Sequence, residues 1–335
     1  MSSDNNYVWG CWLLIASMRM NSMDEPVIIL ADNYTPESVE CLEQFDNVKI
    51  VQRDESFKRN LTFSKPDAML LADTEYITWV DCDALFYGNC SEYLSPEPGY
   101  IHVRQRAYAE NALGYAKFYT ENDKKGPIPD RVLDTWQKDV GENEEAAFDT
   151  CVSACYISIP NKFRFILERW REQIAKVMPE DNVGIVDKRS VAYFQTDESV
   201  LNSVLCFCKG APKIVPDFKL DKDPEAFFIH FNYQPKPWHL WNDYTIKHYD
   251  KTVSTVEWAV ANKYKTPGAI PFALNRKYSF WSHLLAPFTR NYYRAKKILN
   301  KYIILTVKGA VTFHCIHYCF DIFQRYVRIK TIYHH

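Results

Sequence analysis

Asp81 and Asp83 carry the clearest chemical pattern in the chain. They follow a hydrophobic run and are separated by one small residue, Cys82. Side chains alternate in an extended segment, so the two carboxylates point to one side and Cys82 points away. Carboxylate oxygens at this spacing can reach a single divalent cation. The pattern therefore indicates a metal site, although solvated aspartates in a turn would give the same sequence.

A second polar pattern lies in the segment 228–238, FIHFNYQPKPW. His230 stands in a strand-like run, and Lys236 stands between two prolines that stiffen the backbone. Imidazole and carboxylates together suit Mn²⁺, with Mg²⁺ as the alternative cation. A lysine fixed in this way could neutralise the β-phosphate of a nucleotide. The two patterns together predict a site for a metal and a diphosphate, although His230 could be a core residue and Lys236 a surface charge.

The elements that must position these residues are alternating strands and helices. The run Ile77–Val80, just before Asp81, is rich in β-branched and aromatic residues, which predicts a buried strand of a parallel or mixed sheet. Thr35 followed by Pro36 predicts the start of a helix. We expect further strands at 27–30, 48–51, 100–103, 152–159, 213–215 and 226–231, and helices at 12–20, 35–45, 66–72, 162–178 and 197–208. This alternation predicts an α/β fold with ligands at the carboxyl ends of the strands.

One long segment, 107–147, interrupts this alternation. It is polar and holds the turn-rich stretch NDKKGPIPD. We expect a surface insertion, acting either as a lid or binding loop or as a solvated excursion without a function.

Composition places limits on the class of protein. The chain has 335 residues, and its hydrophobic content of 47% excludes a disordered protein. Ten cysteines are scattered without a short repeated spacing, which favours a reducing compartment over a disulfide framework. The apolar stretch Trp9–Ala16 is too short to span a bilayer, and the residues before it lack Lys and Arg. We therefore expect a cytoplasmic protein.

The C-terminal part has a different charge balance. From Arg276 onward there are eleven Lys and Arg residues against one acid, Asp321, interleaved with aromatic and aliphatic residues. This pattern is typical of a peripheral anchor on a membrane of anionic lipid. We expect residues 1–270 to form the main domain and residues 271–335 to form this membrane-associating tail. Nucleic-acid binding and a zinc site at His314–Cys319 are weaker interpretations, because the run Tyr302–Val307 suits lipid and the histidine and cysteine spacing matches no finger pattern.

Four motifs, in order, resemble those of retaining glycosyltransferases of family 8, the glycogenin and lipopolysaccharide galactosyltransferase type. That family's Asp-x-Asp strand resembles Ile77–Asp83, and its lysine sixteen residues before the first aspartate is matched by Lys65. Its Asp-Gln-x-x-Leu-Asn helix start is similar to Asp197–Asn202. Its His-x-x-Gly-x-x-Lys-Pro-Trp motif is similar to His230–Trp238, with Asn-Tyr-Gln in place of a glycine-containing turn. The similarity runs over roughly residues 7–238.

The resemblance implies a GT-A type fold, a Rossmann-like mixed sheet flanked by helices that binds a nucleotide-diphospho-sugar. It also implies a role for each matching residue. Asp81, Asp83 and His230 would bind Mn²⁺ or Mg²⁺. Three further residues would bind the donor: Tyr7 at the base, Lys65, and Lys236 at the diphosphate. Asp197 would bind hydroxyl groups of the donor sugar, and Glu198 would lie near the anomeric carbon.

Two departures from the family pattern bear on activity. Glu198 stands where the family usually has glutamine, and a carboxylate there could stabilise an oxocarbenium-like centre or act as a nucleophile. Only MSSDNN precedes Tyr7, so we expect the first strand of the family's sheet to be missing and nucleotide binding to be weakened.

The functional expectation is a metal-dependent hexosyltransferase. It would move a hexose from a UDP-sugar to a glycan, lipid-linked or protein-linked acceptor, with retained anomeric configuration and with no nucleic acid as partner. One alternative is a pseudoenzyme that binds the nucleotide sugar without turnover, which the missing strand would favour. Another is a phosphatase of the haloacid dehalogenase type, which also ends a hydrophobic strand in Asp-x-Asp. The position of Asp81 far from the N-terminus argues against the phosphatase.

Overall fold

The computed structural model describes residues 1–53, 61–179, 191–215 and 227–303. The chain divides into two compact units, Met1–His230 and Phe231–His335, and each is described by itself. The predicted division into residues 1–270 and a tail 271–335 remains a prediction.

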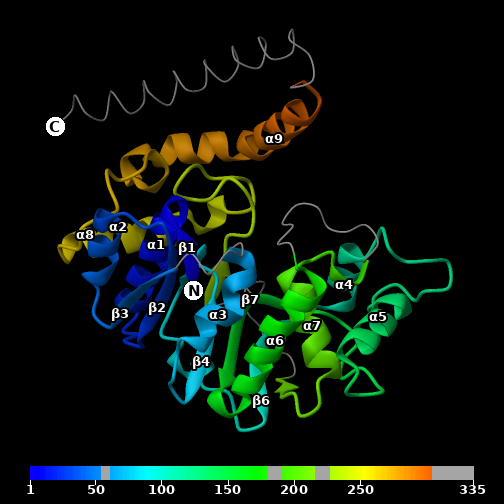
Figure 1. The fold of residues 1–335 in the computed structure, drawn as a ribbon. Coiled ribbons are helices and arrows are strands. Elements are labelled where there is room, and N and C mark those ends of the chain that lie inside the picture. The colour runs from blue at the N-terminus through cyan, green and yellow to red at the C-terminus, as the bar shows by residue number, and fades with distance from the viewer. Residues whose placement is uncertain (54–60, 180–190, 216–226, 304–335) are drawn as a thin grey trace. The chain divides into compact units, whose positions relative to one another are not determined.

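The first unit begins with a parallel sheet in the order β1 (Ser2–Asp4), β2 (Val27–Asp32), β3 (Val48–Gln52). Helix α1 (Val8–Met20) follows β1, and α2 (Pro36–Glu43) follows β2 (Figure 1). The predicted cap of α2 is confirmed, because the Thr35 hydroxyl accepts a hydrogen bond from the Ser38 N–H at 3.3 Å.

The expectation of a missing first strand is wrong. β1 pairs with β2 in parallel, with Ser2 opposite Leu30 and Asp4 opposite Asp32. Its residues are short and polar, so they give no hydrophobic signal of a strand, yet Ser3 is buried. β1 therefore forms because it pairs with the apolar strand β2, and not because its own residues have a high β propensity.

A second, mixed sheet holds the residues of the predicted site. Its order is β4 (Tyr76–Val80), β7 (Val152–Pro160), β6 (Tyr100–Gln105), β8 (Lys213–Ile214). β7 is antiparallel to β4 and β6, and β8 is parallel to β6. β7 is buried along nearly its whole length, as expected for a central strand with both faces covered. A separate antiparallel pair, β5 (Ala84–Phe86) with β9 (Phe228–His230), sets Ala84 opposite His230.

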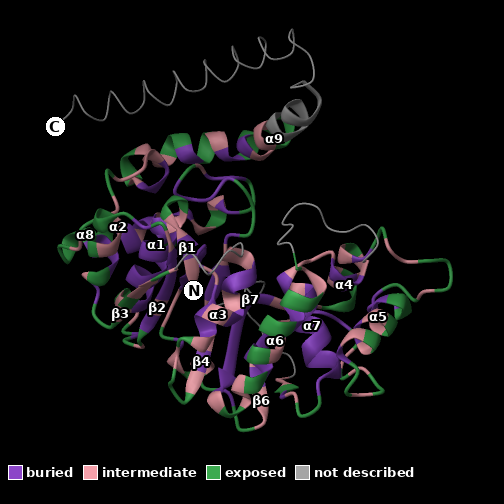
Figure 2. Ribbon diagram, in the orientation of Figure 1, coloured by how far each residue is buried: buried purple, intermediate pink, exposed green. Residues whose placement is uncertain are grey.

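Five helices complete the described part of the first unit: α3 (Lys65–Leu70), α4 (Tyr108–Gly114), α5 (Asp130–Val140), α6 (Arg164–Val177) and α7 (Asp197–Phe207). α3 and α5 pack on α6 and α7 respectively, and α6 packs on α7. Large aromatic side chains fill the core beneath them, and Figure 2 shows the buried residues concentrated in the strands and inner helix faces.

The segment 107–147 is not a solvated excursion. It contains α4 and α5, and its Tyr115 and Trp136 side chains are fully buried in the core. The Trp136 indole N–H donates to the Ala192 carbonyl at 2.8 Å. The segment is polar overall because the outer faces of its helices are exposed, while a few large residues anchor it.

The second unit contains α8 (Tyr249–Ala261) and α9 (Ser279–Ile303). Trp241 ties it together, since its indole N–H donates to the Ala273 carbonyl and its own carbonyl accepts from the Thr289 hydroxyl. Within the described residues, no helix combines the length and hydropathy needed to cross a bilayer. The cluster His314–Cys319 and the run Tyr302–Val307 include residues outside the described part of the chain.

Candidate active site

Asp81, Asp83 and His230 come together as predicted. Asp81 directly follows β4, and its N–H donates to the Cys155 carbonyl of β7 at 3.0 Å. Asp83 directly precedes β5, and His230 ends β9 opposite Ala84. His230 Nε2 lies 3.2 Å from Asp83 Oδ1 and 3.5 Å from Asp81 Oδ2. One ligand atom from each of the three residues lies within 4.8 Å of the others.

This donor set fits a divalent cation. Ligands at about 2.1 Å in octahedral geometry are about 3.0 Å apart, close to the separations around His230 Nε2. Burial works against a charged imidazole, but Asp83 outweighs it and raises the pKa of His230 well above its usual range. The Asp81 and Asp83 carboxylates beside His230 give the site a negative potential, which suits a metal cation. Cys82, between the two aspartates, is buried.

Lys65 links the cluster of Asp81, Asp83 and His230 to the start of α7. Its Nζ lies 3.1 Å from Asp81 Oδ1 and 3.2 Å from Asp197 Oδ2, and it donates to the Ala154 carbonyl at 3.2 Å. Burial alone would lower the pKa of Lys65, but Asp197 and Asp81 together raise it. The Trp79 indole N–H also donates to Asp81 Oδ1 at 2.8 Å. Lys65 and Trp79 therefore hold one oxygen of Asp81, and the other oxygen faces His230.

The start of α7 is strained. Thr196, the residue before the helix, has a φ of +55°, which is costly for a β-branched residue. Its hydroxyl donates to Asp197 Oδ1 at 3.0 Å, and the Asp197 carbonyl accepts from the Trp170 indole N–H at 3.0 Å. Burial raises the pKa of the Asp197 carboxyl, and Lys65 opposes this shift. Backbone strain maintained at such a turn is typical of a functional site.

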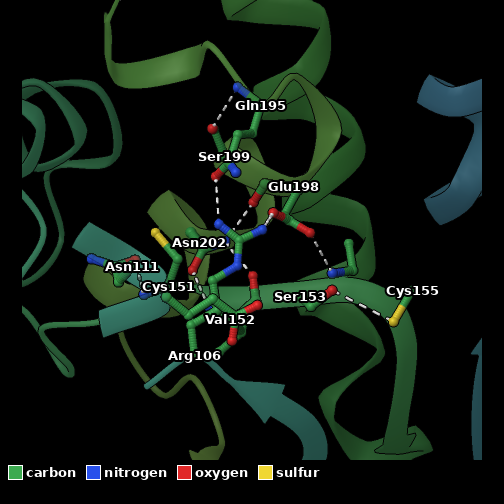
Figure 3. A network of polar contacts seen from close by, with 12 residues as sticks. Arg106, Asn111, Cys151, Val152, Ser153, Cys155, Gln195, Glu198, Ser199 and Asn202 are labelled. Carbon is green, nitrogen blue, oxygen red and sulfur yellow. Dashed lines mark hydrogen bonds and ion pairs between the residues drawn. The ribbon is translucent and has the colours of Figure 1, made fainter. Parts of the chain in front are cut away.

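Glu198 is held by a polar network that spans three elements (Figure 3). One carboxylate oxygen, Oε1, forms an ion pair with Arg106, and the other accepts from the Ala154 N–H at 3.0 Å. Arg106 also donates to Gln195 Oε1 at 3.1 Å. Burial raises the pKa of Glu198, and Arg106 opposes that shift. Sequence reasoning missed Arg106, although its position just beyond the predicted strand 100–103 was a possible signal.

Asn202 fixes α7 against β7. Its side-chain oxygen accepts from the Val152 N–H at 2.7 Å, and its amide donates to the Val152 carbonyl at 3.0 Å (Figure 3). Asn202 lies one helical turn beyond Glu198. The two hydrogen bonds between Asn202 and Val152 therefore fix the position of Glu198 along β7.

Two further predicted site residues, Tyr7 and Lys236, belong to other elements of the chain. Tyr7 is in the short turn Asn5–Tyr7 between β1 and α1, beyond the carboxyl end of β1. Lys236 belongs to the second unit, where it is buried and donates to the Phe231 carbonyl at 2.6 Å. Their contacts with a nucleotide remain predictions.

Comparisons with known proteins show the fold. Scans against protein-family models and against curated protein sequences find no match. Among solved structures, the chain is similar to the galactosyltransferase LgtC in complex with donor and acceptor sugar analogs. The TM-score is 0.50 and the identity 12%, over 79% of this chain and 95% of LgtC.

The chain is also similar to the bifunctional glycosyltransferase WbbM in its apo form. Here the TM-score is 0.50 and the identity 16%, over 76% of this chain. The chain spans about half the length of WbbM, with 48% of that protein covered. The predicted GT-A type α/β fold is thereby confirmed, and the predicted resemblance holds at the level of the fold: the chain has the fold of these glycosyltransferases.

Proposed function

We propose that the chain is a metal-dependent retaining glycosyltransferase that transfers a hexose from a UDP-sugar to a glycan, lipid-linked or protein-linked acceptor. The observation that carries this proposal is the cluster of Asp81, Asp83 and His230 at strand ends of a GT-A type fold. Lys65 contacts Asp81 of this cluster and also Asp197, which supports the proposal that Lys65 and Asp197 bind the same donor.

Each group has a chemical task in this reaction. A cation held by Asp81, Asp83 and His230, Mn²⁺ or Mg²⁺, would neutralise charge on the diphosphate leaving group. Lys65 is positioned to exchange its contact with Asp81 for a contact with the donor. Asp197 offers a buried carboxylate to sugar hydroxyls.

Glu198 would act at the anomeric carbon. Its side chain is 16% exposed, and its two hydrogen-bonded contacts leave other lone pairs of the carboxylate available. A fixed anion at that position would stabilise an oxocarbenium-like centre or form a bond to it as a nucleophile.

Two alternatives lose support. The pseudoenzyme interpretation relied on a missing first strand, and β1 is present and paired. The phosphatase interpretation is less favoured, because the two solved structures described above are glycosyltransferases.

A membrane acceptor is supported by α9. In that helix Phe280, Trp281, Leu284 and Phe288 are exposed, while the buried positions include Ser282 and Thr289. This inverts the usual arrangement of a surface helix, which keeps polar residues outward. Because basic residues follow in the sequence, an anionic lipid surface is the partner that fits both features.

The experiment that tests the activity is release of UDP from a panel of UDP-sugars with Mn²⁺. We expect one sugar to be hydrolysed or transferred, and Asp83→Ala to lower the rate by about 10²–10³-fold. Asp134→Ala, an exposed acid on α5, is the matched control and should leave the rate unchanged. Equal rates in wild type and Asp83→Ala, or turnover without any divalent cation, would exclude the proposed site.

A further inference from the structure

Glu198 is a carboxylate in surroundings that already hold two others. Asp197 is adjacent in the chain, and Lys65 bridges Asp197 to Asp81. The ammonium group of Lys65 is shared by those two carboxylates. A third buried anion at Glu198 therefore needs a cation of its own.

We propose that Arg106 is a positioning residue for Glu198, which it holds in a fixed orientation and in the ionised form for the glycosyl transfer proposed above. This inference rests on the proposed function and concerns a residue that none of the four family motifs contains.

The contacts of Arg106 and Glu198 support this role. They lie 92 residues apart in sequence, and their side chains are 13% and 16% exposed. The Arg106 guanidinium, just beyond the end of β6, holds Oε1 of Glu198, and the Ala154 N–H of β7 holds the other carboxylate oxygen. Rotation of the carboxylate would break at least one of these contacts, so its orientation is fixed by both.

Arg106 is itself fixed. Its N–H donates to the Cys151 carbonyl at 2.8 Å, and its guanidinium donates to Gln195 as well as to Glu198 (Figure 3). A guanidinium with two side-chain partners has little freedom to follow a moving carboxylate. The pair therefore acts as a rigid support and does not behave as a flexible surface ion pair.

A carboxylate at this position differs from the amide that family 8 usually has there. An amide needs no counter-charge, whereas a half-buried carboxylate is driven toward the neutral acid by desolvation. Burial raises the pKa of Glu198, and Arg106 is the strongest opposing influence. Only the ionised form can stabilise a cationic centre or act as a nucleophile, so Arg106 should set the pH at which activity is lost in acid.

Of the neighbouring groups Lys65, Asp197, Tyr115 and Cys151, only Asp197 shares the acidic pH range with Glu198. Lys65 stays charged and Asp197 is its partner. Tyr115 and Cys151 also feel the charge of Glu198, but burial raises the pKa of both thiol and phenol, to about 12 for Cys151. Neither group titrates in the acidic range, so there only Asp197 and Glu198 are relevant among these neighbours.

The test compares Arg106→Gln, Arg106→Lys and Arg104→Gln in donor turnover with Mn²⁺ across the acidic and neutral range. Arg104 is a matched control, because it lies in β6 two residues before Arg106 and pairs with a different acid, Glu110. We expect Arg106→Gln to lower kcat by about 10²-fold, with KM changed less than about threefold, and to move the acid limb to higher pH. Arg106→Lys should restore most of the rate and the limb, and Arg104→Gln should match wild type.

A double-mutant cycle separates positioning from other roles. In a Glu198→Gln background, Arg106→Gln should change kcat by less than about threefold, because its partner is already neutral. The same loss in both backgrounds, or a loss without movement of the acid limb, would overturn the proposal.

A second readout does not depend on turnover. The carboxyl ¹³C resonance of Glu198, assigned by its absence in Glu198→Gln, should titrate at higher pH in Arg106→Gln than in wild type and Arg104→Gln. An unchanged titration would overturn the role of Arg106. If wild type releases UDP from no donor while this titration shifts, the proposed function fails and the support of Glu198 by Arg106 stands.

Discussion

At the scale of single residues, Lys65 is the centre of the charge balance. It is the only cation among the described residues recorded in contact with both Asp81 and Asp197. When a buried ion pair loses one partner, the remaining charge is left without compensation, and the cost is about 3–5 kcal/mol for full burial. The Lys65 side chain is 11% exposed, so a somewhat smaller effect is expected.

We therefore predict that Lys65→Met lowers the free energy of unfolding by about 2–4 kcal/mol in the absence of divalent cation. Mn²⁺ should recover part of this loss, since it brings positive charge to Asp81. Denaturant unfolding with and without Mn²⁺ measures both effects. Lys138→Met, at an exposed position of α5, is the control and should stay within about 0.5 kcal/mol of wild type. A loss of less than 1 kcal/mol for Lys65→Met, by a rough threshold, would show that the bridge contributes little.

At the scale of elements, sequence patterns predicted the helices and strands whose formation depends on neighbouring residues in the chain. The cap at Thr35, the β-branched strand before Asp81 and the amphipathic helix α6 all formed near the expected bounds. β1 was missed because a polar tripeptide becomes a strand only through its partner β2. The helices of segment 107–147 were missed because few of their residues are buried.

The candidate site shows the same division. Asp81, Asp83 and Asp197 could be identified from the sequence, because each lies in a short and continuous motif. The partnership of Arg106 with Glu198 is set by the antiparallel pairing of β6 with β7 and by the docking of α7. Neither the strand pairing nor the helix docking can be predicted from a short stretch of sequence. The sequence therefore pointed to Glu198 but not to its partner Arg106.

The exposed face of α9 makes a separate prediction at this scale. Replacing Phe280 and Phe288, which are 70% and 67% exposed, by serine should weaken binding to vesicles by about tenfold or more, because two large apolar contacts are lost. Vesicle sedimentation with anionic and with zwitterionic lipid measures this. Exchange of Leu113, an exposed residue of α4, for serine is the control. Equal sedimentation of the double variant and wild type would count against a membrane role for this face.

At the scale of the whole molecule, binding of a divalent cation should increase the stability of the folded protein against unfolding. A ligand that binds only the folded chain stabilises it by about 2.7 kcal/mol at a concentration of 100 times Kd. We therefore expect Mn²⁺ to raise the Tm of wild type in a concentration-dependent way and to have little effect on Asp83→Ala. Calorimetric scans at several Mn²⁺ concentrations provide the measurement. An equal rise in both proteins would place the bound cation somewhere other than Asp81, Asp83 and His230.

The pairing of β5 with β9 also has a consequence for synthesis. Asp81 and Asp83 of the candidate metal cluster are translated long before the third candidate ligand, His230. A ribosome must therefore translate the whole stretch from Asp83 to His230 before the imidazole can join the carboxylates. Contacts this distant in sequence form late, after the local helices and neighbouring strands. A nascent chain that stalls between these points would carry an acidic strand end without its third ligand, so metal capture would report that the first unit has been completed.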